Sequence, residues 1–184
     1  VLEAPDGVAL VVVELTTRDP ATRIGHMRAY VEQSGYTPAG YTPVVTTLHV
    51  VRSIPQAVRF YAEVLGLGVL IDTTLATDAA NRLLKLPPGC RTHTVFMQGG
   101  DMYGKVAVAE PLGWRCEELA SRARAPHLGY LAQLFEVEDL VAARLACARV
   151  GAAFVGSATA VAMPPAASTA ATRSSSALST GLVV

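Results

Sequence analysis

Residues 46–67 read TTLHVVRSIPQAVRFYAEVLGL, and this stretch decides the fold. Its first residues are mostly β-branched or apolar, which predicts a strand over Thr46–Val51. Ser53 is a good N-cap, and the apolar residues after it recur at helical spacing, so a helix is expected to begin there. Gly66 is the residue type that commonly ends a helix. The stretch therefore predicts a strand followed by an amphipathic helix.

Three further strands are expected downstream, because three apolar or β-branched segments there are separated by Gly and Pro. The expected strands are Val69–Leu75, Thr92–Gln98 and Lys105–Ala109. A short helix or loop, Asp78–Leu86, lies between the first two, and Gly99–Gly100 forms the turn before the third. The order over residues 44–113 is therefore βαβββ.

The same order begins again after residues 114–126, which we expect to be a connection. Tyr130–Val137 predicts a strand, and Asp139 is a good N-cap for a following helix. We therefore expect residues 127–184 to form a second, divergent or truncated βαβββ module. Its end, residues 164–180, is rich in Ala, Ser and Thr, which fits either a mobile tail or a hairpin that supplies the last strands.

Composition argues against several partners. The 15 basic and 15 acidic side chains cancel, so nucleic acid is not expected. The longest apolar runs, such as Val8–Val13, are much shorter than the about 18 residues that a membrane-spanning helix needs. Cys90, Cys116 and Cys147 are widely spaced and odd in number, which suits a reducing compartment and predicts a cytoplasmic location. The common nucleotide-binding and hydrolase motifs are absent from the sequence.

Residues 48–67 resemble the opening of a module of the vicinal oxygen chelate superfamily, which includes glyoxalase I, bleomycin-resistance proteins and extradiol dioxygenases. Phe60-Tyr61 and Val64-Leu65-Gly66 carry the resemblance, and residues 135–140, FEVEDL, resemble a second opening. The resemblance covers roughly residues 44–184. It implies an α+β fold in which paired βαβββ modules form a curved, cup-like mixed sheet.

Residues 1–16 fit the same resemblance. Pro5-Asp6-Gly7 and the Val-rich run Ala9–Leu15 are similar to the turn and strand that end a module of the family. We therefore expect residues 1–16 to be the last strand of a truncated preceding domain. Residues 17–43 contain a short helical pattern, Ala21–Gln33, followed by several Gly and Pro residues, and we expect them to be a linker.

The resemblance also implies a divalent metal, held by one ligand from the first strand and one from the last strand of each module. His, Gln and Glu are the usual ligands. In this chain the corresponding positions fall at Thr46, near Ala107 and at Ala132, and none is a good metal donor. The fourth position would lie at or beyond Val184. We therefore expect no metal and no other cofactor in this chain, whereas a divalent metal stays open for an intact parent protein.

Five side chains near these positions could carry chemistry, and each has a simpler interpretation. Strand alternation turns His49 toward the helix, away from the cup. His127 is expected in a loop, and Glu110 is expected to be a solvated charge where a strand ends. His93 is expected to be satisfied by packing and one hydrogen bond, and Cys116 to be a partly buried thiol.

Small and apolar residues therefore stand where metal ligands would be. The expected ligand-binding residues are Thr46, Leu48, Val50, Ala107, Ala132 and Leu134. An apolar cup binds small apolar or aromatic molecules, so the predicted function is metal-free small-molecule binding, noncatalytic or weakly catalytic. Two alternatives stay open. In the first alternative, the chain is part of a metal-dependent glyoxalase-type lyase or extradiol dioxygenase whose metal site lies in a missing domain. In the second, it is an interaction module that forms a homodimer.

Overall fold

The computed structural model describes residues 2–3, 8–122, 132–133, 135 and 137–152. The chain divides into two compact units, Val1–Gly129 and Tyr130–Val184. Within the described residues, no helix is both long enough and apolar enough to cross a membrane.

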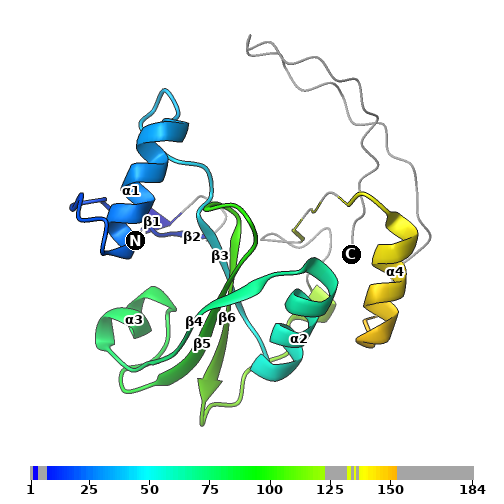
Figure 1. The fold of residues 1–184 in the computed structure, drawn as a ribbon. Helices are drawn as coiled ribbons and strands as arrows, with labels where there is room; N and C mark the ends of the chain where they lie inside the picture. The colour runs from blue at the N-terminus through cyan, green and yellow to red at the C-terminus, as the bar shows by residue number, and fades with distance from the viewer. Residues whose placement is uncertain (1, 4–7, 123–131, 134, 136, 153–184) are drawn as a thin grey trace. The chain divides into compact units, whose positions relative to one another are not determined.

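The first unit is built on a four-stranded mixed sheet with the strand order β3-β6-β5-β4 (Figure 1). Its strands are β3 Thr46–Val50, β4 Gly68–Leu75, β5 Arg91–Gln98 and β6 Lys105–Leu112. The pair β3/β6 is parallel, and the other two neighbouring pairs are antiparallel. Helix α2, Ile54–Leu65, joins β3 to β4, and the six-residue α3, Asp78–Leu83, joins β4 to β5. The βαβββ order predicted for residues 44–113 is confirmed.

Helix α2 begins and ends where the sequence predicts. The Ser53 side chain accepts a hydrogen bond from the Gln56 backbone N–H, which satisfies one of the free donors of the first turn. At the other end Gly66 has a φ of 68°, a left-handed conformation in which a side chain would be strained. The Gly66 N–H then donates to the carbonyl of Ala62, which closes the last turn.

Helix α1, Arg23–Ser34, precedes the sheet and is held against one end of it. The Arg23 guanidinium donates to the Leu70 carbonyl at 3.2 Å, at a position where the β4/β5 register is interrupted. Tyr30 donates to the Asp101 carboxylate at 3.2 Å, and its ring lies edge-on to that of Tyr103 at 5.3 Å. The helical pattern within residues 17–43 is confirmed, and this helix contacts the β5–β6 turn.

The Val-rich run near the amino terminus forms a shorter strand than predicted. Only Ala9–Leu10, which is β2, pairs, and it does so antiparallel with β1, Leu2–Glu3. Val11, Val12 and Val13 are exposed and lie outside any strand. The interpretation of residues 1–16 as the end of a preceding domain stays a prediction.

In the second unit the described helix is α4, Leu140–Arg149. Asp139 caps it as predicted, since its carboxylate accepts from Val141 N–H at 2.8 Å and from Ala142 N–H at 3.0 Å. Residues 153–184 lie outside the described residues, as do several residues of the strand expected over Tyr130–Val137. The second module, the pairing of modules and the cup-like curvature therefore stay predictions.

Candidate functional site

The two faces of the sheet differ, because α2 covers one of them. The ring of His49 on β3 lies 6.5 Å from that of Tyr61 on α2, and Glu110 on β6 accepts a hydrogen bond from the Ile54 backbone N–H at 2.9 Å. We call the face that carries His49 and Glu110 the α2 face. Alternate residues of a strand point to opposite sides of the sheet. Leu48 and the residues two positions before and after it on β3 therefore lie on the side away from α2, which we call the opposite face.

Apolar residues from all four strands lie on the opposite face, because residues paired in register share a face of the sheet. Leu48 and Phe96 both pair with Ala107, and Phe96 also pairs with Ile71. Val95, Val106 and Val108 face the other way, toward α2, and are fully buried. The opposite face is therefore a second apolar surface, separate from the packing under α2.

Four of the six predicted ligand-binding residues lie on this face. Thr46, Leu48 and Val50 follow one another along β3, and Ala107 pairs with Leu48 from β6. Leu48 is 40% exposed and Val50 53% exposed, whereas Ala107 is fully buried. Ala132 is exposed and belongs to the second unit, and Leu134 lies outside the described residues. Ligand binding by these residues stays a prediction.

The opposite face also carries a cluster of threonines that sequence reasoning missed. Thr92 and Thr94 lie on β5 on the same side as Phe96, and Thr73 of β4 pairs with Thr94. Thr92 and Thr94 are fully buried, and their hydroxyl groups make no hydrogen bond with any residue that the structure describes. The signal available in the sequence was the spacing of two, which places both hydroxyl groups on one face of a strand.

Lys105 is a second polar feature of the opposite face that was not predicted. It begins β6, pairs with Thr46 and is only 5% exposed. Its ammonium group donates to the Met102 carbonyl in the β5–β6 turn. Burial lowers the pKa of Lys105, and the nearby Asp101 carboxylate acts in the opposite direction.

Comparisons with known proteins agree with this fold. The structure is similar to the crystal structure of a glyoxalase family protein from Bacillus cereus, with a TM-score of 0.54 and 24% sequence identity over 64% of this chain and 76% of that one. The matched part of the chain therefore has the same fold as that glyoxalase family protein. No protein family model matches the sequence. No curated protein matches it either.

A divalent metal does not fit the described residues at the positions where the resemblance places its ligands. The first-strand position holds Thr46, the last-strand position holds Ala107, and a methyl group cannot coordinate a cation. The neighbouring Lys105 ammonium would also repel a divalent ion. Within residues 8–122 and the shorter described ranges, no three His, Cys, Asp or Glu side chains gather closely enough to hold a metal.

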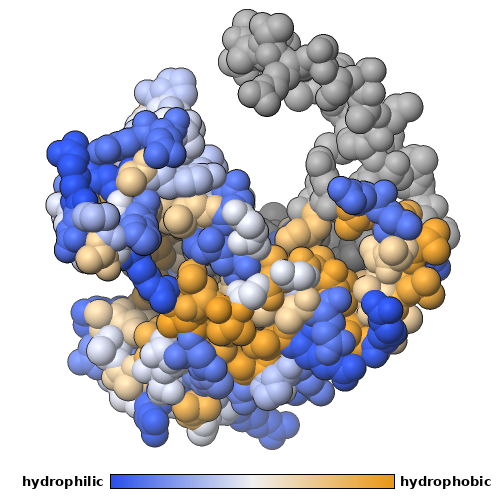
Figure 2. Space-filling model, in the orientation of Figure 1, coloured by the Kyte–Doolittle hydropathy of each residue, from blue (hydrophilic) through white to orange (hydrophobic). Residues whose placement is uncertain are grey.

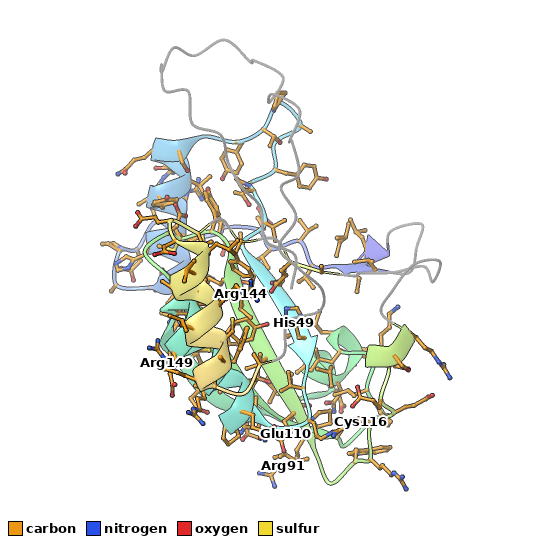
Figure 3. All side chains as sticks on the ribbon, turned by 90° about the vertical axis from the view of Figure 1, so that its right-hand side faces the viewer. His49, Arg91, Glu110, Cys116, Arg144 and Arg149 are labelled. Carbon is orange, nitrogen blue, oxygen red and sulfur yellow. The ribbon has the colours of Figure 1, made fainter. Side chains whose placement is uncertain are left out.

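The remaining candidates can be placed by their contacts, and Figure 3 labels His49, Glu110 and Cys116. His49 faces α2 as predicted. His93 is partly buried and makes the expected hydrogen bond, from Nε2 to the Asp72 carboxylate at 2.7 Å. The prediction for Glu110 was wrong, because its carboxylate accepts from the first turn of α2.

Cys116 also differs from expectation. It was expected to be partly buried and is exposed, in the connection that follows β6. His127 lies outside the described residues.

Proposed function

We propose that this protein binds a small apolar or aromatic molecule on the opposite face of its sheet, without the help of a metal ion. The observation that carries the proposal is that Leu48 and Val50, both large and apolar, stay substantially exposed beside the buried Ala107. Exposed apolar side chains that share one face offer a molecule the same burial that a core offers. The lack of good metal donors at Thr46 and Ala107 supports the metal-independent form of this function.

The fold supports the same proposal by analogy alone. A likeness to a glyoxalase family protein shows an architecture, and such architectures host several chemistries. The lyase or dioxygenase alternative and the homodimer alternative stay predictions.

The proposal can be tested with N-phenyl-1-naphthylamine, an uncharged aromatic probe whose fluorescence increases in apolar surroundings. The titration is performed with EDTA present, and we expect saturable binding to one site per chain. Val50→Glu places a charge on the opposite face and should weaken binding roughly tenfold, since it removes the contact of one apolar side chain and requires desolvation of a carboxylate.

Val69→Glu is the matched control. Val69 is 54% exposed, compared with 53% for Val50, and it also lies on an edge strand of the sheet. It pairs with Met97, whose side chain lies on the α2 face, so Val69 also lies on that face. Figure 2 shows apolar surface where Figure 1 labels β4. We expect Val69→Glu to leave the dissociation constant within about twofold. Equal losses in the two variants, or binding that EDTA abolishes, would contradict the proposal.

A further inference from the structure

The two edge strands of the sheet differ in length. At one edge β3 has five residues, whereas β4 at the other edge has eight and pairs, among the described strands, with β5 alone. The outer side of an edge strand presents backbone N–H and C=O groups that can pair with a strand of another chain. A short edge strand limits such pairing, so β4 is the edge at which strand addition would extend furthest.

The first half of β4 is the part of the strand most suited to strand addition. Val69, Leu70 and Ile71 are consecutive apolar residues, and Leu70 is 39% exposed. The charged residue of the strand is Asp72, which is hydrogen-bonded to His93, and the strand contains no Lys or Pro. Lys and Pro are residues that commonly prevent an edge strand from pairing with another chain. The residue types of β4 therefore give it little protection.

Two other features protect β4, and both lie at Leu70. The register between β4 and β5 shifts between Val69 and Ile71, and such an irregularity makes an edge strand a poorer partner. In addition, the Arg23 guanidinium of α1 donates to the Leu70 carbonyl at 3.2 Å. In the most apolar part of the edge, a side chain from another element therefore occupies a backbone acceptor.

Contacts at the other end of α1 hold Arg23 beside β4. Arg23 is the first residue of this helix, and Ser34 is the last. Near the end of the helix, Tyr30 donates to the Asp101 carboxylate, and Ser34 is hydrogen-bonded to the Tyr103 hydroxyl at 3.1 Å. Because α1 is fixed to the β5–β6 turn in this way, the Arg23 side chain is held close to the Leu70 carbonyl.

We propose that Arg23 blocks the β4 edge against strand addition by β4 of a second copy of this chain. Two identical strands can pair antiparallel about a twofold axis, and such an interface is self-complementary and closed. Charge does not oppose this pairing strongly, since the strand carries one charged residue, Asp72, and its carboxylate is bonded to His93. The proposal concerns the edge of the sheet and does not depend on ligand binding to the opposite face.

The test compares the weight-average mass of variants by sedimentation equilibrium. Arg23→Ala removes the donor to the Leu70 carbonyl, and Ala is a residue that favours helix, so α1 should be retained. Arg23→Met removes the donor and keeps a long unbranched side chain. Both variants should form a dimer, which raises the mass about twofold over that of the unmodified chain at equal concentration. Far-UV circular dichroism identifies a variant that fails to fold, and the other variant then decides the result.

Arg18→Ala is the matched control. The Arg18 side chain is exposed and pairs with Glu32 of α1, so its removal changes the net charge equally and leaves the Leu70 contact in place. Its mass should equal that of the unmodified chain. The double variant Arg23→Ala/Leu70→Lys places a charge on the freed edge and should reverse the association.

Three results would overturn the proposal. The first is an unchanged mass in folded Arg23→Ala or Arg23→Met. The second is equal association of Arg18→Ala, because loss of a positive charge would then be the cause instead of release of the Leu70 carbonyl. The third is association that persists in the double variant, because it would show that a surface other than β4 forms the dimer.

Discussion

The two faces of the sheet treat their polar side chains differently. On the α2 face Glu110 accepts from Ile54 N–H, and His93 is hydrogen-bonded to Asp72. On the opposite face Thr92 and Thr94 are equally part of the sheet, and their hydroxyl groups make no hydrogen bond with any described residue. Glu110 and His93 therefore help to hold the fold together through their hydrogen bonds, whereas the two threonines contribute mainly through the packing of their side chains.

The difference also separates two kinds of substitution. Removing a partnered group leaves its partner unsatisfied, which costs more than the hydrogen bond contributed. Removing an unpartnered hydroxyl leaves nothing unsatisfied. Removal of the Glu110 carboxylate should therefore destabilise the protein, whereas Thr92→Val and Thr94→Val should leave its stability nearly unchanged.

The largest expected effect is at Glu110. Glu110→Ala should lower the free energy of unfolding by about 1.5–3 kcal/mol, the usual range for a hydrogen bond to a charged group, because Ile54 N–H then loses its acceptor. Glu110→Gln keeps an acceptor of nearly the same shape and should lower it by about half as much. Urea denaturation measures both. If Glu110→Ala costs no more than Thr94→Val, the two faces do not differ in the way proposed.

The sequence was sufficient wherever a local signal determines the structure. Ser53, Gly66 and Asp139 mark helix ends through contacts within one turn, and all three were predicted correctly. Glu110 could not be interpreted in this way, since its partner Ile54 lies 56 positions away. From sequence it was a charge near the end of a strand, and only the packing of α2 against β6 reveals its role.

The same distinction holds within the candidate site. Strand alternation alone places Thr46, Leu48 and Val50 on one face, and the register confirms that arrangement. The position of Lys105 beside Thr46 depends on the parallel pairing of two distant strands, which no local pattern predicts. The importance of Thr92 and Thr94 depends on their burial, which is a property of the folded chain.

The buried Lys105 of the opposite face should make the free energy of unfolding depend on pH. Burial lowers its pKa, so the folded protein holds the lysine proton less tightly than the unfolded chain does. The unfolded state therefore binds more protons between the lowered pKa and 10.5, the ordinary value, and the free energy of unfolding should rise with pH in that window. Lys105→Met should remove this contribution, as urea denaturation at several pH values would show.

Tyr30 also titrates at alkaline pH, and its raised pKa sets the highest pH at which the Lys105 experiment can be interpreted. Burial and the adjacent Asp101 raise its pKa above 10.0, so its contribution to stability is lost as pH rises beyond that value. Below pH 10.0 the difference in slope between the unmodified protein and Lys105→Met therefore reports Lys105 without a contribution from Tyr30, and Tyr30→Phe should leave the slope there unchanged. A slope that is the same in Lys105→Met and the unmodified protein would show that the buried ammonium costs the fold nothing.

The smallest expected effect is at His93 and Asp72, whose hydrogen bond lies at the partly exposed edge of the α2 face. A double-mutant cycle with His93→Ala and Asp72→Ala should give a coupling free energy of about 0.2–1 kcal/mol, because solvent weakens exposed pairs. Arg59 and Glu63, an exposed pair on one helix, provide a reference expected near 0.3–0.5 kcal/mol. Zero coupling at His93 would leave Glu110 as the one tested polar group of the α2 face that stabilises the fold, and the contrast with Thr92 and Thr94 would then depend on that one carboxylate.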